Sequence, residues 1–197
     1  MQLQPGKKVY FASDQHFGAP TPELSFPREQ KFVNWLNEIK NDAQVLFLLG
    51  DLFDFWFEYK TVVPKGFVRV LGKLAELKDM GIEIHFFVGN HDLWMNDYFE
   101  KELQIPVYHT SQIFKFNDKS FFIAHGDGLG PGDYGYKRMK KVFTNPFSKW
   151  LFGWLHPDIG VKLAQTLSVK NKLISGDEDV VFLGEDKEWL ILYAKKK

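Results

Sequence analysis

The sequence predicts an α/β fold built on a largely parallel sheet. Residues 43–49 are a continuous apolar run, as expected of a buried parallel strand, and residues 82–88 are expected to be the next buried strand. Between them, residues 68–80 carry apolar side chains at helical spacing and are followed by Gly81. Strand and helix therefore alternate along the chain, and that order is typical of a parallel sheet with helices on its faces.

Other elements extend this pattern on both sides. Residues 8–13 form the first expected strand. A helix is expected to open at Phe26-Pro27-Arg28-Glu29, with Pro27 near its first turn and apolar residues recurring at helical spacing up to Ile39. Residues 106–109 are expected to be short and extended. A hairpin with its turn at Asn117-Asp118 is expected over residues 113–124.

The character of the chain changes at Tyr134. Up to about residue 173 it is dense in apolar and aromatic side chains, is broken at Pro146 and Pro157, and carries interspersed lysines, so we expect helices that form a lid. Residues 185–197 give a last helical pattern that ends in three lysines. The predicted division is a core at residues 1–133, a helical lid insertion at 134–175 and a return helix of the core at 176–197.

Composition limits the classes of function. The chain has 197 residues and zero formal net charge, so nothing in the overall balance favours nucleic acid as a partner. Cysteine is absent, which excludes thiolate metal sites and cysteine nucleophiles. No apolar stretch reaches the ~20 residues of a membrane span, and the first residues lack the apolar region of a signal peptide. We therefore expect a cytoplasmic protein, with an unusual aromatic content of 17%.

Four short stretches place potential metal ligands where strands should end. They are Asp14-Gln15-His16, Gly50-Asp51, Gly89-Asn90-His91-Asp92 and His125-Gly126-Asp127. Loops at the carboxyl ends of strands converge on one crevice in open α/β sheets, so these side chains are expected to meet. Taken singly, each stretch is better explained by turns and helix caps, which favour Asp, Asn and Gly. The ordered series favours a metal site.

Carboxylate, amide and imidazole groups suit hard divalent cations, and two such ions need a bridging ligand. Asp14 and His16 could bind one ion, and Asn90 and His125 could bind a second. Asp51 lies at the position expected to bridge them. The sequence therefore predicts a site for two divalent ions.

These motifs resemble the calcineurin-like metallophosphoesterases, whose pattern includes Asp-x-His, Gly-Asp-x-x-Asp and Gly-Asn-His-[Asp/Glu]. Asp51-Leu52-Phe53-Asp54 fits the second of these. The resemblance implies an α/β/β/α sandwich carrying the helical lid. It also implies that Asp14, His16 and Asp51 hold the first ion and that Asp51, Asn90 and His125 hold the second.

A narrower resemblance covers most of the chain. Three features carry this resemblance: the stretch Gly50-Asp51-Leu52-Phe53-Asp54-Phe55-Trp56, the aromatic lid, and the stretch His125-Gly126-Asp127-Gly128-Leu129 followed by Asp133 and Tyr136. On these features the chain resembles the UDP-2,3-diacylglucosamine hydrolase family of lipid A biosynthesis, in its Bacteroidetes form. That family uses two Mn²⁺ ions to activate a water, which attacks the α-phosphorus and releases UMP and 2,3-diacylglucosamine 1-phosphate (lipid X). The resemblance implies a lipid-linked nucleotide-sugar substrate and a peripheral place on the cytoplasmic face of the inner membrane.

Further roles follow from the same resemblance. His91 matches the residue that polarises the phosphate or protonates the leaving group, and Asp92 is expected to orient His91. Asp54 either supports the site or shapes its loop. The lid aromatics would face acyl chains or membrane, or simply pack the lid helices together. Four residues are expected near the substrate: Asp133, Tyr136, Lys170 and Lys172.

The family's last motif, Gly-His-x-His, does not occur before the chain ends at Lys197. We expect that the C-terminal strands are missing through truncation, that metal binding is weak, that hydrolase activity is low or absent, and that the exposed sheet edge favours oligomers or aggregation. Two alternatives to the hydrolase stay open. One is another calcineurin-like phosphoesterase acting on nucleotides or phosphodiesters, and the other is a non-catalytic scaffold with the same fold.

Overall fold

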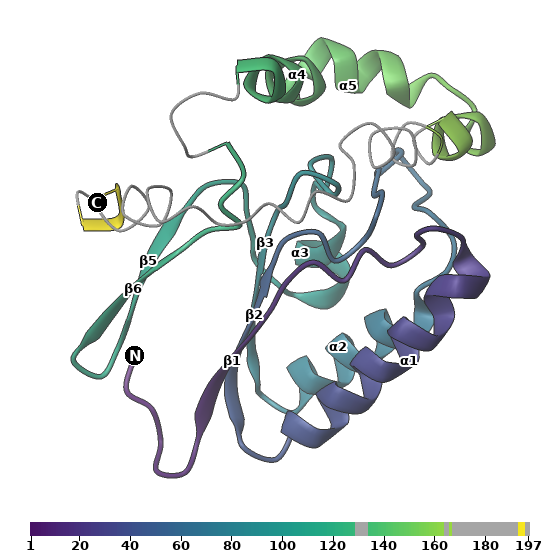
Figure 1. Ribbon diagram of the computed structural model, residues 1–197. Coiled ribbons are helices and arrows are strands. Elements are labelled where there is room, and N and C mark those ends of the chain that lie inside the picture. The colour runs from purple at the N-terminus through teal and green to yellow at the C-terminus, as the bar shows by residue number, and fades with distance from the viewer. Residues whose placement is uncertain (129–133, 164–165, 167–192, 196–197) are drawn as a thin grey trace. The chain divides into compact units, whose positions relative to one another are not determined.

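The computed structural model describes residues 1–128, 134–163, 166 and 193–195 (Figure 1). The chain divides into two units, Met1–His125 and Gly126–Lys197. In the first unit a parallel sheet has the strand order β1-β2-β3-β4. Its strands are β1 (Lys8–Ala12), β2 (Ala43–Leu49), β3 (Glu83–Phe87) and β4 (Val107–Tyr108). The parallel α/β architecture predicted from the apolar runs is confirmed.

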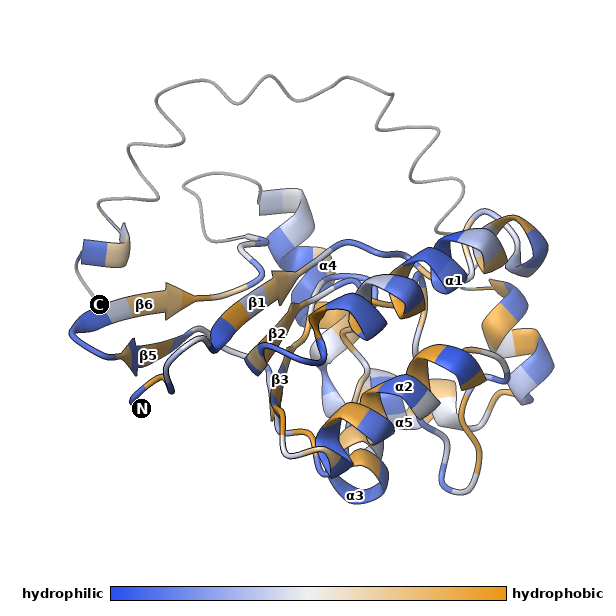
Figure 2. Cartoon of the chain, turned by 90° about the horizontal axis from the view of Figure 1, so that it is seen from below, coloured by the Kyte–Doolittle hydropathy of each residue, from blue (hydrophilic) through white to orange (hydrophobic). Residues whose placement is uncertain are grey.

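Alternate residues of β2 point to opposite faces of the sheet, as the pleat of a strand requires. Leu46 and Leu48 join the larger apolar core, together with residues of the helices α1 (Pro22–Ile39), α2 (Val68–Asp79) and α3 (Tyr98–Leu103). Val45 and Phe47 join a second core with residues of the hairpin formed by β5 (Gln112–Phe116) and β6 (Lys119–Ile123). Helices therefore cover one face of the sheet and the hairpin covers the other (Figure 1). Figure 2 shows the apolar colouring of the strands between these layers.

Two helices differ from expectation. Helix α1 begins at Pro22, because Thr21 caps it by accepting the Leu24 amide at 3.3 Å and Pro22 occupies the first turn. The predicted start at Phe26 is therefore wrong, and Pro27 lies inside the helix. Helix α3 has six residues, too few for a helical pattern to stand out in the sequence.

The second unit contains α4 (Tyr134–Thr144) and α5 (Pro146–Gly153), and residues 157–163 are also helical. Pro146 and Pro157 each stand at the first residue of a helix, where the missing amide hydrogen costs nothing. The predicted helical character of this part is confirmed over the described residues. The predicted return helix at 176–197 lies almost wholly outside them, and the three-part division of the chain stays a prediction. Among the described residues, no helix is both long and apolar enough to cross a membrane.

Candidate metal centre

Hydrogen bonds donated by backbone amides join the loops after three strands at the carboxyl end of the sheet. The Asp14 amide donates to the Gly50 carbonyl at 3.1 Å, and the His16 amide donates to the Asp51 carbonyl at 2.9 Å. These bonds hold the loop after β1 against the loop after β2. The loop after β3 joins them through the His91 amide, which donates to Asp51 Oδ1 at 2.8 Å. The predicted convergence of these loops is thereby explained.

Three of the expected ligands have left-handed backbones. The φ angles are 57° for Asp14, 46° for His16 and 53° for Asp51. This region costs an L-residue roughly 1–2 kcal/mol, although Asp tolerates it better than most. Such conformations persist only where surrounding contacts impose them, and they gather at functional sites.

Two glycines allow the loops to approach closely. A Cβ at Gly50 would lie 2.6 Å from His125 Nδ1 and 2.7 Å from Gly89 Cα. A Cβ at Gly89 would lie 2.2 Å from Asp51 Oδ1. Both glycines therefore leave the space that the carboxylate and the imidazole occupy.

The first expected ligand set is brought together. Asp14, His16 and Asp51 each offer a ligand atom, and these atoms lie within 4.8 Å of one another. His16 Nε2 is 3.7 Å from Asp51 Oδ2 and 4.0 Å from Asp14 Oδ1. Two carboxylates and an imidazole at this spacing fit a hard or borderline divalent ion.

The second expected set shares the same carboxylate oxygen. His125 Nε2 lies 3.6 Å from Asp51 Oδ2 and 3.2 Å from Asn90 Oδ1. His125 Nδ1 lies 2.7 Å from the Leu49 carbonyl, which can only accept, so Nδ1 carries a proton and Nε2 is the nitrogen that can serve as a metal ligand. Asp51 Oδ2 therefore lies between two imidazoles, in the arrangement that a bridging ligand needs.

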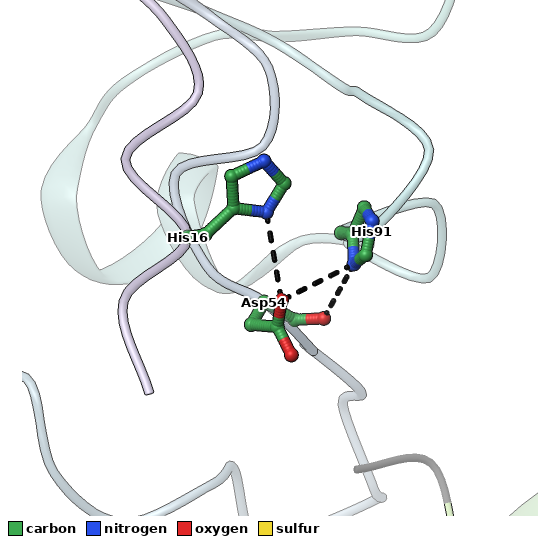
Figure 3. A group of neighbouring side chains, drawn as sticks. All are labelled: His16, Asp54 and His91. Carbon is green, nitrogen blue, oxygen red and sulfur yellow. Dashed lines mark hydrogen bonds and ion pairs between the residues drawn. The ribbon is translucent and has the colours of Figure 1, made fainter. Parts of the chain in front are cut away.

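Figure 3 shows a further group, formed by His16, Asp54 and His91. His91 Nδ1 donates to the Asp54 carbonyl at 3.0 Å and lies 3.5 Å from Asp54 Oδ1. The same Oδ1 lies 3.5 Å from His16 Nδ1, and the two imidazole rings meet edge to face at 4.6 Å. Asp54 is buried, so it contacts both histidines from inside the fold.

Asp92 lies elsewhere than predicted. Its carboxylate accepts the amides of Gly89 at 2.7 Å, Leu52 at 3.0 Å and Asp51 at 3.3 Å, and so ties two ligand loops together. Complete burial, with the nearby Asp51 carboxylate, raises the pKa of Asp92 to about 7 against the opposing pull of the three amides. The contacts with His91 that the sequence suggested for Asp92 are made by Asp54. In the sequence, the Gly-Asp-x-x-Asp spacing was the signal that could have identified Asp54 as this partner of His91.

In the second unit, Tyr136 is held by Asp127. The tyrosine hydroxyl donates to Asp127 Oδ2, and Lys140 Nζ reaches the same oxygen at 2.5 Å. Asp133, Lys170 and Lys172, which are expected near the substrate, lie outside the described residues. Their roles and that of Tyr136 stay predictions.

Comparisons with known proteins agree with this geometry. A family described as "Calcineurin-like phosphoesterase" matches residues 7–184. The chain is 38% identical to a UDP-2,3-diacylglucosamine hydrolase of Porphyromonas gingivalis, over 96% of this chain and 76% of that protein. A protein of the same name from Histophilus somni is 27% identical, over 93% of this chain and 76% of that protein. Another from Haemophilus influenzae is 28% identical, over 84% of this chain and 68% of that protein.

Proposed function

Because the chain belongs to the calcineurin-like phosphoesterase family, and is thus a metallophosphoesterase hydrolase, we propose that it cleaves UDP-2,3-diacylglucosamine to UMP and 2,3-diacylglucosamine 1-phosphate. The relatives that carry this name span most of the chain. The observation that supports the proposal most is the position of Asp51 Oδ2, which faces His16 Nε2 at 3.7 Å and His125 Nε2 at 3.6 Å. A carboxylate shared in this way is what a two-ion site requires.

Asp14, His16 and Asp51 would hold one divalent ion, and Asp51, Asn90 and His125 would hold the other. We propose Mn²⁺ at both positions, as the family resemblance implies and as the carboxylate and amide oxygens of the two sets suit. Such ions, when bound, lower the pKa of water and neutralise charge on phosphate oxygens.

His91 would assist the departure of the leaving group. Attack of water on the α-phosphorus breaks the bond to the bridging oxygen, which leaves with the acylated sugar phosphate. The Asp54 carbonyl accepts from His91 Nδ1 at 3.0 Å and fixes the ring, so Nε2 is the nitrogen that would donate to this oxygen, from a ring that carries a proton on both nitrogens. Asp54 would act by holding both His91 and His16 in place.

The second unit would meet the lipid part of the substrate. Phe147 and Trp150 on α5 and Trp154 directly after it are 66%, 58% and 74% exposed, and Trp150 packs against both of the others. Helix α4 carries Lys137, Arg138, Lys140 and Lys141. Exposed aromatics next to basic residues suit the surface of an anionic bilayer, so we propose peripheral binding at the cytoplasmic face of the inner membrane. Asp133, Tyr136, Lys170 and Lys172 would contact the substrate.

The test is a single-turnover assay with enzyme in excess over UDP-2,3-diacylglucosamine, in which UMP and the lipid phosphate are identified by mass spectrometry. We expect both products with Mn²⁺ and neither with a chelator or with Asp51→Asn. Hydrolysis of a soluble phosphodiester alone would instead indicate another phosphoesterase. A chain that retains no Mn²⁺ would indicate a scaffold. The low activity expected from the sequence stays a prediction, which multiple-turnover rates would test.

A further inference from the structure

We propose that Arg28 is a positioning residue for the first metal ion. It acts indirectly, by holding the backbone of the ligand His16. The inference rests on the proposed function, because it concerns the affinity of the Asp14, His16 and Asp51 set for a divalent ion. Arg28 lies on α1, twelve residues beyond His16, and it is half-buried.

The contacts of Arg28 are directed at the carbonyl groups of the ligand loop. Its Nη2 donates to the His16 carbonyl at 2.8 Å and to the Ala19 carbonyl at 2.6 Å, and lies 3.5 Å from Ser25 Oγ. The His16 amide meanwhile donates to the Asp51 carbonyl at 2.9 Å. Both backbone polar groups of His16 are therefore held: the amide by the bridging residue, and the carbonyl by Arg28 together with the Ala19 amide, which donates to it at 3.2 Å.

His16 needs this support because its backbone is strained. Its φ of 46° is left-handed, a conformation that costs an L-residue roughly 1–2 kcal/mol. The Ala19 amide donates to the same carbonyl at 3.2 Å and the Phe17 amide donates to the Leu52 carbonyl at 2.9 Å, so Arg28 adds a shorter, charged bond to a peptide that two neutral bonds also hold. Loss of the Arg28 bond would weaken the resistance of this peptide to a rotation that relieves the strain. Rotation would turn the side chain and carry Nε2 away from Asp51 Oδ2, which now lies 3.7 Å distant.

The remainder of the guanidinium agrees with this role. Arg28 Nε is buried and has no hydrogen-bond partner among the described residues. Leaving the buried Nε donor unpaired is unfavourable, so the position of the guanidinium is set by the carbonyl groups to which Nη2 donates. Helix α1 supports the same loop a second time, because the buried Ser25 Oγ accepts the Gly18 amide at 2.8 Å.

The test measures Mn²⁺ affinity at each position separately, by following the EPR signal of free Mn²⁺ during titration. Asn90→Ala removes a ligand of the second position only, and Asp14→Ala removes a ligand of the first only. Arg28→Met is then introduced into both backgrounds, since Met keeps an apolar stem and removes the donors. Arg69→Met is the matched control, because Arg69 is an exposed residue of α2 whose guanidinium lies over the Phe26 ring.

In the Asn90→Ala background we expect Arg28→Met to raise the Mn²⁺ dissociation constant about tenfold, as is typical when a group supporting a ligand is lost. In the Asp14→Ala background the constant should change less than about threefold, and Arg69→Met should change neither. Equal constants with and without Arg28 in the Asn90→Ala background would overturn the inference. So would equal weakening in both backgrounds, which indicates a general loss of structure. If the unsubstituted chain binds no Mn²⁺, the proposed function fails instead.

Discussion

At the scale of single residues, Asp51 combines two roles in one carboxylate. Its Oδ1 accepts the His91 amide at 2.8 Å, and this bond fixes the rotation of the group. Its Oδ2 is left to face His16 and His125. Because the side chain is buried, these contacts are made away from competing water.

The space around Asp51 depends on Gly89. Gly89→Ala should abolish Mn²⁺ binding, because the added methyl would lie 2.2 Å from Asp51 Oδ1 and 2.6 Å from its backbone nitrogen. Isothermal titration calorimetry checks this. Gly72→Ala is the matched control, since nothing lies within 4 Å of the added methyl inside α2. It should leave binding unchanged and raise the free energy of unfolding by roughly 0.5–1 kcal/mol. Unchanged Mn²⁺ binding in Gly89→Ala would contradict the close approach.

His91 should separate catalysis from metal binding. His91→Asn is expected to lower kcat by about 10²–10⁴, because it removes the group that donates to the leaving oxygen. The two Mn²⁺ dissociation constants should change little, since the ligand sets do not include His91. Steady-state kinetics and Mn²⁺ titration on one preparation check both statements. A loss of Mn²⁺ binding as large as the loss of kcat would make His91 a ligand instead.

At the scale of elements, a distant carboxylate completes α3. Glu58 Oε2 accepts the amides of Asp97 and Tyr98, at 2.8 and 3.0 Å, where this six-residue helix begins. Glu58 Oε1 accepts the Asn96 amide at 2.8 Å and Trp56 Nε1 at 3.0 Å. The cap is therefore supplied from a loop about forty residues earlier.

Glu58→Gln should lower the free energy of unfolding by about 1–2 kcal/mol, because an amide nitrogen replaces one accepting oxygen and the charge at the helix start is lost. Urea unfolding followed by far-UV circular dichroism measures the change. Glu38→Gln, at an exposed position of α1, should stay within about 0.5 kcal/mol of the unchanged chain. Equal stability of the two variants would mean that Glu58 does not cap α3.

The sheet face beneath the hairpin buries a histidine. His85 Nε2 lies 2.8 Å from Glu83 Oε1, its Nδ1 lies 3.1 Å from the Tyr108 hydroxyl, and Phe47 stacks on its ring. Burial lowers the pKa of His85, assisted by the charge of Lys78 and opposed by Glu83. The fold therefore favours the neutral ring. The resulting stability is complete above the unfolded pKa of about 6.5 and is lost as the pH falls through the lower folded pKa.

His85→Gln should flatten this pH dependence, since glutamine can meet both neighbours without titrating. Urea midpoints at pH 7.5 and pH 5.5 give the comparison. The difference between the two midpoints should be smaller in the variant than in the unchanged chain. An equal or larger difference in the variant would show that other groups control the acid sensitivity.

At the scale of the whole molecule, we expect the exposed apolar surface of the second unit to contribute to membrane binding. Trp150→Ser combined with Trp154→Ser should lower partitioning onto anionic vesicles about tenfold or more, because each indole buries a large apolar area at a bilayer surface. Sedimentation with phosphatidylglycerol vesicles measures this. Leu24→Ser, at a 66% exposed position on α1, is the control and should partition as the unchanged chain does. Unaltered partitioning of the double variant would exclude α5 as the membrane contact.

The sequence by itself determined the parallel sheet and the hairpin that follows it, and it predicted which side chains gather at the carboxyl end of the sheet. These features follow from apolar periodicity and from the residues that directly follow each strand, and both can be read from short stretches of sequence. Only the tertiary structure decided that Asp54 rather than Asp92 contacts His91, that Glu58 caps α3, and that Arg28 holds the His16 carbonyl. Each of these contacts joins a side chain to a backbone group between 12 and 40 residues away. Every residue offers the same backbone groups, so no pattern of residue types reveals which of them a distant side chain will meet.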